Sequence, residues 1–382
     1  MARFSADLVG SRQREVESFV HIAITCPYNI DTPGGVQSQV IGLAETLSTE
    51  NRLTILTPGT MVPESLKNSS VEMILLGSTF GFAANGSVAP VSLSLKAALR
   101  LHRYLEETAP DVLIIHEPMV PIVSSVALFS SAKRKIGVFH RGGNTKALSL
   151  LRPLASLILT KLDDGIVVSE EARDSVRALI GERSRGFRRI PNAVDVARFE
   201  PRERNARRKG AILFLGRHEH RKGLGVLLEA FSKLGPGFTL SIIGSGPETA
   251  KLTIKYPPSD TLHWLGQVSI KEMVHLMHES EIFVAPSLGG ESFGVILLEA
   301  MAAEVPVICS DISGYRLAAE NAAVFVEPGN ATNLARAIRE LSDDEAAQNE
   351  LAHRGHRRSR EFNFSVAGKR YLGVIESISA TG

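Results

Sequence analysis

The sequence predicts an α/β protein built from two consecutive doubly wound (Rossmann-like) units that face a cleft. Short apolar runs rich in β-branched residues alternate with helical patterns, which is typical of parallel sheets covered by helices on both faces. The alternation is interrupted once, by a segment rich in basic residues, and then starts again. A chain of 382 residues is long enough for two such domains, each with its own core.

The first unit is predicted to start with a strand at residues 19–25. Residues 1–18 lack the apolar stretch of a signal peptide, and we expect them to form a disordered or poorly packed extension. Helical patterns follow at 36–47 and 95–106. Five further strands are predicted at 53–57, 71–75, 112–115, 136–139 and 165–168.

The segment 192–210 is interpreted as the connection between the units. We expect a first domain at 19–192 and a second domain at 193–363, followed by a final helix over about 364–380. The strands of the second unit are predicted at 211–215, 240–243, 261–264, 282–285, 306–310 and 323–326.

Composition excludes several classes of protein. The net charge of +2 argues against nucleic acid as the main partner, because nucleic-acid-binding domains usually carry a clear basic excess. Cys26 and Cys309 lie in or beside apolar strands, which predicts buried thiols rather than a disulfide framework or a zinc site. No run of about 18 apolar residues occurs, so we expect no membrane-spanning segment.

Function is expected in the loops that follow strands, because ligands of open α/β sheets bind at the carboxyl ends of the strands. Gly34 and Gly35 follow the first strand and precede a helix. They either let the backbone approach a phosphate at the helix N-terminus or form a tight turn that needs positive φ. Both readings stay open. Gly244 and Gly246, in GSGPE, are interpreted as turn residues.

Two cations follow the first strand of the second unit, in FLGRHEHRKG. Arg217 comes directly after the strand and its glycine, and Lys222 lies near the start of a helix. Such a pair can neutralise a diphosphate and stabilise it as a leaving group. The alternative is a solvated charged turn, and the position of the pair favours the diphosphate site.

The segment APSLGGESFGVILLEAMAA contains two glutamates eight residues apart. Glu291 is expected in the glycine-rich loop, and Glu299 about two turns into a helix that begins near Phe293. A carboxylate accepts hydrogen bonds from the vicinal hydroxyls of a sugar or ribose. Glu299 is costly in this apolar helix without a partner, which favours a ligand over a structural role. The amides around Ser292–Gly294 can reach phosphate oxygens.

A histidine ends the predicted strand at 136–139. His140 could donate a hydrogen bond to a sugar hydroxyl or accept one from it, or it could be a satisfied structural histidine. His116 and Glu117 occupy a similar strand end.

Several stretches taken together resemble a known family: PGGVQSQV, IHEP, the strand-end His140, IPNAVDVARF, FLGRHEHRKG, GSGPE, WLGQV and above all GGESFGVILLEAMAA. They are similar to the retaining GT-B glycosyltransferases of glycosyltransferase family 4, from about Val20 to Tyr371. Within that family the chain looks most like actinobacterial phosphatidylinositol α-mannosyltransferases, through CPYNIDTPGGVQSQV, ANGSVAP and LGGESFGVILLEAMAA.

The resemblance implies GDP-mannose as donor, phosphatidylinositol or another lipid as acceptor, and a peripheral position on the anionic cytoplasmic face of the plasma membrane. It also implies that the domain at 19–192 binds the acceptor, that the domain at 193–363 binds the nucleotide sugar, and that the final helix crosses back to the first domain. No tightly bound cofactor is implied. No aspartate cluster of the DxD kind is present, and a requirement for a divalent cation stays open.

Carried over position by position, the resemblance also implies roles for single residues. Gly35 would approach the donor phosphates, and His140 would lie near the reacting sugar. The other donor-binding residues would be Arg217 and Lys222 on the diphosphate, Glu291 on the transferred sugar, Glu299 on the ribose, and Ser292, Phe293 and Gly294. The acceptor-binding residues would be Tyr28, Gln37, Asn85 and Lys146.

Other interpretations remain open. Lys96, Arg100 and Arg103 share one helical face by spacing, which suits either an anionic membrane or plain solvent. The donor could be another nucleotide sugar such as UDP-glucose, with a different lipid or a soluble acceptor. A catalytically silent nucleotide-sugar-binding protein would not need the four charged residues of the donor site, and the Glu-x7-Glu pattern speaks against an epimerase.

Overall fold

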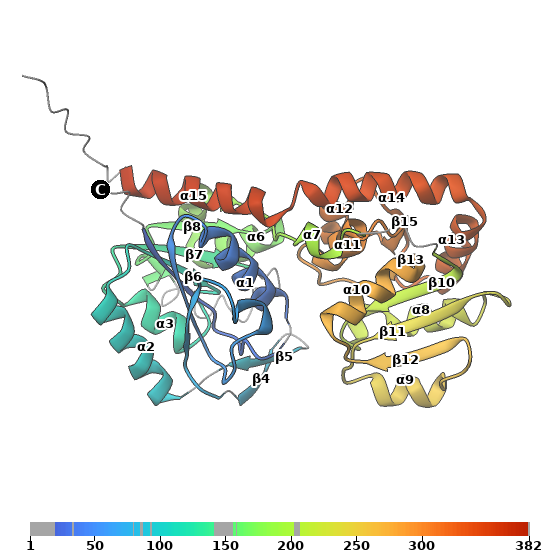
Figure 1. Cartoon of the computed structure of the whole chain (residues 1–382), viewed down its shortest axis with the longest axis horizontal. Coiled ribbons are helices and arrows are strands. Elements are labelled where there is room, and N and C mark those ends of the chain that lie inside the picture. Colours follow the sequence, from blue (N-terminus) through green and yellow to red (C-terminus); the bar gives the residue numbers. More distant parts are fainter. Residues whose placement is uncertain are drawn as a thin grey trace, which may run out of the picture.

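The computed structural model describes residues 20–32, 34–78, 80–84, 87–91, 94–140, 156–157, 159–201 and 207–380. Two lobes lie side by side, each built on its own parallel sheet (Figure 1). Helices cover both sheets, which confirms the predicted class of two doubly wound units.

The first sheet has seven strands within the described residues, in the order β3-β2-β1-β6-β7-β8-β9, and all its neighbouring strands are parallel. The strands are β1 (His21–Thr25), β2 (Arg52–Thr57), β3 (Glu72–Leu75), β6 (Val112–His116), β7 (Arg134–Phe139), β8 (Asp164–Val167) and β9 (Arg188–Arg189). Six of them lie where the sequence predicts strands. The sequence pattern missed the two-residue β9 and the antiparallel hairpin of β4 (Phe80–Ala84) and β5 (Ser87–Val91).

The helices of the first lobe are α1 (Gly35–Leu47), α2 (Leu95–Thr108), α3 (Val123–Leu128) and α6 (Glu170–Ile180), with 3-10 turns η1 (Glu64–Leu66) and η2 (Gly181–Gly186). Alternate residues of a strand point to opposite faces of the sheet. Ile22 and Ile24 of β1 accordingly join the cluster that contains α1, whereas Ala23 joins the cluster that contains α2 and α3. Both faces of the sheet are therefore buried, as its near-continuous apolar strands require.

The second sheet has six strands within the described residues, in the order β12-β11-β10-β13-β14-β15. The strands are β10 (Arg208–Leu215), β11 (Thr239–Ile243), β12 (Leu262–Gly266), β13 (Ser280–Ala285), β14 (Val307–Ser310) and β15 (Val324–Val326). The helices are α8 (Leu224–Phe231), α9 (Thr249–Lys255), α10 (Ile270–Glu279), α11 (Val295–Ala302), α12 (Ser313–Ala319), α13 (Ala331–Asp343) and α14 (Glu345–Arg360), with the 3-10 turn η3 (His220–Lys222). Cys26 and Cys309 are buried free thiols, as predicted.

Two segments cross between the lobes. The first contains the short helix α7 (Val196–Phe199), and β10 already begins at Arg208, so the predicted connection to residue 210 runs too far. The second crossing joins α14 to α15 (Phe364–Ala380). The two crossings touch, because the backbone N–H of Val194 donates to the carbonyl of Phe362 at 2.9 Å.

The last helix, α15, lies on the first lobe (Figure 1), where it packs against α1. The contact is close because Gly42 of α1 has no side chain. A Cβ on Gly42 would lie 2.3 Å from the ring of Phe364. No helix in the described part of the chain is long and apolar enough to cross a membrane.

Candidate donor and acceptor site

The loops after β10 and β13 lie against each other at the edge of the second sheet. The backbone N–H of Leu288 donates to the carbonyl of Arg221 at 2.7 Å. Gly223 has φ of +71°, and a Cβ there would lie 1.9 Å from the carbonyl oxygen of Pro286. Glycine at this position lets the segment with the two predicted cations contact the glycine-rich loop.

Five charged side chains from these two loops form what we call the charged cluster: Arg217, Glu219, Arg221, Lys222 and Glu291. Oε1 of Glu291 accepts from Nζ of Lys222 at 2.6 Å and from Nη1 of Arg221 at 2.8 Å. Glu219 pairs with Nε of Arg217 at 3.2 Å and with Nε of Arg221 at 3.0 Å. The predicted Arg217, Lys222 and Glu291 therefore share one cluster of side chains.

The charged cluster is unevenly buried. The side chain of Glu219 is 3% exposed and that of Lys222 is 18% exposed, whereas that of Arg217 is 46% exposed. A plain solvated turn does not describe Lys222, which is largely buried against Glu291. Three cations and two carboxylates give the cluster a positive formal charge, and its binding of a diphosphate stays a prediction.

The sequence reasoning missed Glu219 and Arg221 of this cluster. Both lie inside the RHEHRKG segment between the two cations that the reasoning selected. The alternation of basic and acidic residues there was a visible signal. The pairing of Arg221 and Lys222 with Glu291 is not visible there, because Glu291 belongs to the loop after β13.

The glycine-rich loop leads into α11, which begins at Val295 rather than near Phe293. Glu299 is therefore a little more than one turn into the helix, and the expected two turns are wrong. Gly294 caps the helix with φ of +87°, and the ring of Tyr315 packs against it. Phe293 is 1% exposed and packs edge-on against Phe362, so only its backbone is placed to meet a ligand.

Glu299 lies in a largely apolar setting. Burial raises the pKa of its carboxyl from 4.5 to about 7, although the nearby Arg198 acts in the opposite direction. Among the described residues no hydrogen bond or ion pair to this carboxyl group occurs. A carboxylate of this kind is expected to gain from a ligand that donates hydrogen bonds.

The GSG segment after β11 has a packing role, in agreement with its interpretation as turn residues. A Cβ on Gly244 would lie 2.0 Å from the carbonyl oxygen of Gly216, and one on Gly246 would lie 2.7 Å from the backbone nitrogen of His218. His218 is buried, which lowers the pKa of its imidazole to about 4.

The loop after β1 excludes the tight-turn interpretation of its two glycines. Gly34 has φ of −169°, which is extended backbone, and Gly35 is the first residue of α1 without positive φ. A Cβ on Gly34 would collide with the side chain of Gln37, whereas one on Gly35 would meet no atom of the described residues within 4 Å. Open space above the first turn of a helix suits the approach of an anion.

The predicted acceptor residues are only partly described. Tyr28 is 5% exposed and Gln37 is 7% exposed, and Nε2 of Gln37 donates to the carbonyl of Asn29 at 3.1 Å. Both side chains are therefore buried, and that of Gln37 is bonded to the backbone of the loop after β1. Asn85 and Lys146 lie outside the described residues.

Both ring nitrogens of His140 have protein partners. Its Nε2 lies 2.8 Å from Nδ1 of His116, and its Nδ1 lies 3.0 Å from Oδ1 of Asn192. The backbone N–H of His140 donates to Glu117 at 3.1 Å. In this arrangement His140 would have to exchange one partner before its ring could bind a sugar hydroxyl, and its role near the sugar stays a prediction.

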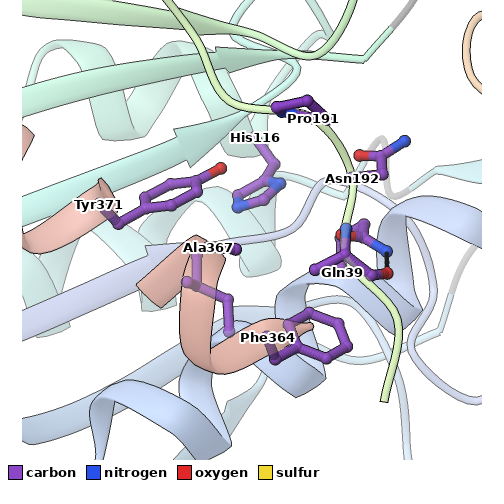
Figure 2. Close-up of a pocket in the computed structure, with 9 residues that line it drawn as sticks. Gln39, His116, Pro191, Asn192, Phe364, Ala367 and Tyr371 are labelled. Atoms are coloured by element: carbon purple, nitrogen blue, oxygen red, sulfur yellow. Dashed lines mark hydrogen bonds between the residues drawn. The ribbon is translucent and has the colours of Figure 1, made fainter. Parts of the chain in front are cut away.

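A small cavity of about 10 Å³ lies beside this pair, between α1, α15 and the segment at 191–193. His116 and Tyr371 point toward one another across it (Figure 2). Nε2 of His116 has no hydrogen-bond partner in the described part of the chain. Burial, with the neighbouring His140, holds the pKa of His116 well below its usual value, so the ring is neutral.

Comparison with known proteins agrees with this architecture. A glycosyltransferase from Rickettsia africae superimposes with a TM-score of 0.76 at 18% identity, covering 96% of this chain and all of that one. Anabaena HepE in complex with UDP and glucose superimposes with a TM-score of 0.73 at 15% identity, over 94% of this chain and all of that one. The fold is that of the GT-B glycosyltransferases.

Sequence similarity is more specific. The family model for glycosyltransferase family 4 matches residues 33–198, and that for glycosyl transferases group 1 matches residues 196–360. The phosphatidyl-myo-inositol mannosyltransferase of Mycolicibacterium smegmatis is 33% identical over 382 residues, covering 95% of each chain. That of Propionibacterium freudenreichii is 28% identical over 373 residues, covering 93% of this chain and 94% of its own. The chain belongs to glycosyltransferase family 4 and is an enzyme of the glycosyltransferase class.

Proposed function

We propose that the enzyme transfers mannose from GDP-mannose to phosphatidylinositol with retention of anomeric configuration, at the inner face of the plasma membrane. The names of the two full-length relatives support the sugar and the acceptor. The observation that carries the transferase chemistry is the charged cluster, in which Lys222 and Glu291 meet at 2.6 Å beside the N-terminus of α11.

The donor would be held between these side chains. Arg217 and Lys222 would bind the diphosphate, and the amides of Ser292–Gly294 would add backbone donors at the start of α11. Glu291 accepts three donors on Oε1, the third being the hydroxyl of Ser287 at 3.5 Å. Its Oε2 has no partner among the described residues and would accept from the transferred sugar. Glu299 would accept from the ribose.

The reaction would depend on stabilisation of the leaving group. As the bond from the anomeric carbon to the phosphate oxygen breaks, negative charge develops on the diphosphate, where Arg217 and Lys222 compensate it. The acceptor hydroxyl would form the new bond on the same face of the sugar. A phosphate oxygen of the departing nucleotide would take its proton.

The acceptor is proposed to lie at the first lobe, near Gly35, Tyr28 and Gln37, with Asn85 and Lys146 as further contacts. Membrane contact is proposed for one face of α2. Leu95 and Leu99 are 73% and 57% exposed on this helix. Three exposed cations lie on the same helix, and we call them the α2 basic face: Lys96, Arg100 and Arg103. Exposed leucines next to cations suit the headgroup region of an anionic bilayer.

One assay tests the proposal. The purified chain is incubated with GDP-mannose, GDP-glucose, UDP-glucose and UDP-galactose, with or without phosphatidylinositol vesicles, and the release of free nucleotide is followed. We expect release of GDP from GDP-mannose that depends on the lipid, and an α-linked product by NMR. Release of UDP, or release that is independent of the lipid, would favour another donor or acceptor. Binding without release would favour a catalytically silent protein.

A further inference from the structure

Glu219 and Arg221 connect the two predicted donor-binding side chains Arg217 and Glu291. We propose that Glu219 and Arg221 are positioning residues, which fix Arg217 and Glu291 in place before the nucleotide sugar arrives. This inference rests on the proposed function, because it assumes that Arg217 binds the diphosphate and Glu291 the sugar. The ion pairs run without interruption from Arg217 through Glu219 and Arg221 to Glu291.

The geometry of Glu219 suits this role. Its side chain is 3% exposed and its two oxygens face two arginines. Oε2 accepts a hydrogen bond from Nε of Arg221 at 3.0 Å, whereas Oε1 lies 3.2 Å from Nε of Arg217 in an ion pair without hydrogen-bond geometry. Both contacts are made to Nε, the guanidinium nitrogen nearest the backbone. The hydrogen bond at Nε of Arg221 restrains the plane of its guanidinium group close to its attachment point. One buried carboxylate thus holds Arg221 by a hydrogen bond and attracts Arg217 by its charge.

Arg221 extends the restraint to the other loop. Besides its Nε contact to Glu219, its Nη1 donates to Oε1 of Glu291 at 2.8 Å and approaches the carbonyl of Gly290 at 3.3 Å. The planar fork of arginine allows two carboxylates to be held at once in fixed directions, which the ammonium group of lysine does not reproduce. Arg221 therefore joins the loop after β10 to the loop after β13 through side chains.

Two simpler explanations make different predictions. If Glu219 only balances charge, its removal should leave the cations freer and strengthen binding of a diphosphate, with turnover unchanged. If the ion pairs only stabilise the fold, nucleotide affinity and turnover should fall together with thermal stability. A positioning role predicts loss of turnover with retained affinity for the nucleotide, because small misplacement of groups around the reacting centre lowers the rate steeply.

Two variants and one control test the proposal in the full-length chain. Glu219→Gln keeps the volume of the side chain but removes its charge, and Arg221→Lys keeps the charge but removes the fork. The control is Glu350→Gln, which removes an exposed ion pair with Arg354 on α14. The measurements are the Kd for GDP by calorimetry, kcat and KM with the nucleotide sugar that the unmodified enzyme uses best, and the melting temperature.

We expect kcat to fall about 10- to 100-fold in both variants, while the Kd for GDP changes by less than about 3-fold. The control should match the unmodified enzyme. Unchanged kcat in both variants, or parallel losses of GDP affinity, kcat and melting temperature, would overturn the positioning role alone. Absence of turnover by the unmodified enzyme with every nucleotide sugar would overturn the proposed function and the inference with it.

Discussion

Replacing Glu299 by glutamine tests whether the partly buried carboxylate of α11 binds the donor. Desolvation raises the pKa of Glu299 from 4.5 to about 7. A rise of this size corresponds to about 3 kcal/mol of differential interaction between the protonated and charged forms. Desolvation favours the protonated form, so above pH 7 the folded protein carries a charged carboxylate at a cost in free energy.

The sign of the effect on stability follows from proton binding. Between pH 4.5 and about 7 the folded protein holds a proton on Glu299 that the unfolded chain has lost. The free energy of unfolding therefore falls as pH rises through this window. Glu299→Gln carries no such penalty. We expect it to be more stable than the parent at pH 8, by up to about 3 kcal/mol, and equal to it at pH 4.5.

Donor binding should show the opposite preference. Ribose hydroxyls donate to a carboxylate, so a bound donor favours the charged form and lowers the pKa of Glu299. We expect donor affinity to rise from pH 6 to pH 8, with proton release on binding. Hydrogen bonds to charged groups contribute about 1.5–3 kcal/mol. Glu299→Gln should therefore weaken donor binding about 10- to 100-fold at pH 8 and abolish most of its pH dependence.

Calorimetry in buffers of different ionisation enthalpy measures both the affinity and the released proton. Thermal melts of the two proteins at pH 5 and pH 8 measure the stability difference. Donor binding by Glu299 is refuted if the glutamine variant binds the donor as tightly as the parent at pH 8. It is refuted equally if the affinity of the parent is the same at pH 6 and pH 8.

Three further predictions concern other parts of the molecule. Arg217→Ala should lower kcat about 100- to 1000-fold in the nucleotide-release assay, as loss of a preorganised charge does, and near-normal turnover would refute its role. Replacing the α2 basic face with glutamines should weaken sedimentation with anionic vesicles but leave binding of the nucleotide sugar unchanged; unchanged sedimentation would favour a plain solvated face. Gly42→Ala should destabilise the fold by about 1–3 kcal/mol in urea unfolding, because the added methyl group overlaps the ring of Phe364 at 2.3 Å. Its control, Gly373→Ala on α15, has open space around the added atom and should be neutral or stabilising.

The strands and the class of fold could be predicted because the signals are local. Buried parallel strands such as β1 and β6 are short, mainly apolar runs, and the helical patterns of α1 and α2 lie between them in the chain. The hairpin of β4 and β5 and the two-residue β9 were missed. These elements are short or lie outside the main parallel sheets, so periodicity distinguishes them poorly from loops.

The site could be predicted only as far as the loops that carry it. The position of Arg217 after a strand, and the spacing of Glu291 and Glu299, are visible in the sequence. The predicted start of α11 near Phe293 is two residues too early. Gly294 has φ of +87°, which is not helical, so the helix begins at Val295. The sequence pattern also left Gly34 and Gly35 undecided, since only the backbone angles exclude a tight turn.

The pairings within the charged cluster lie beyond local sequence reasoning. Glu219, Arg221 and Lys222 are neighbours in the chain, and each could pair locally or with solvent. The approach of Glu291 selects among these possibilities, since Arg221 and Lys222 both turn toward it across the contact between the two loops. That contact depends on Gly223, where a Cβ would lie 1.9 Å from the carbonyl oxygen of Pro286. A turn glycine thus permits the approach through which Arg221 and Lys222 reach Glu291, and this part of the cluster follows from the packing of its loops.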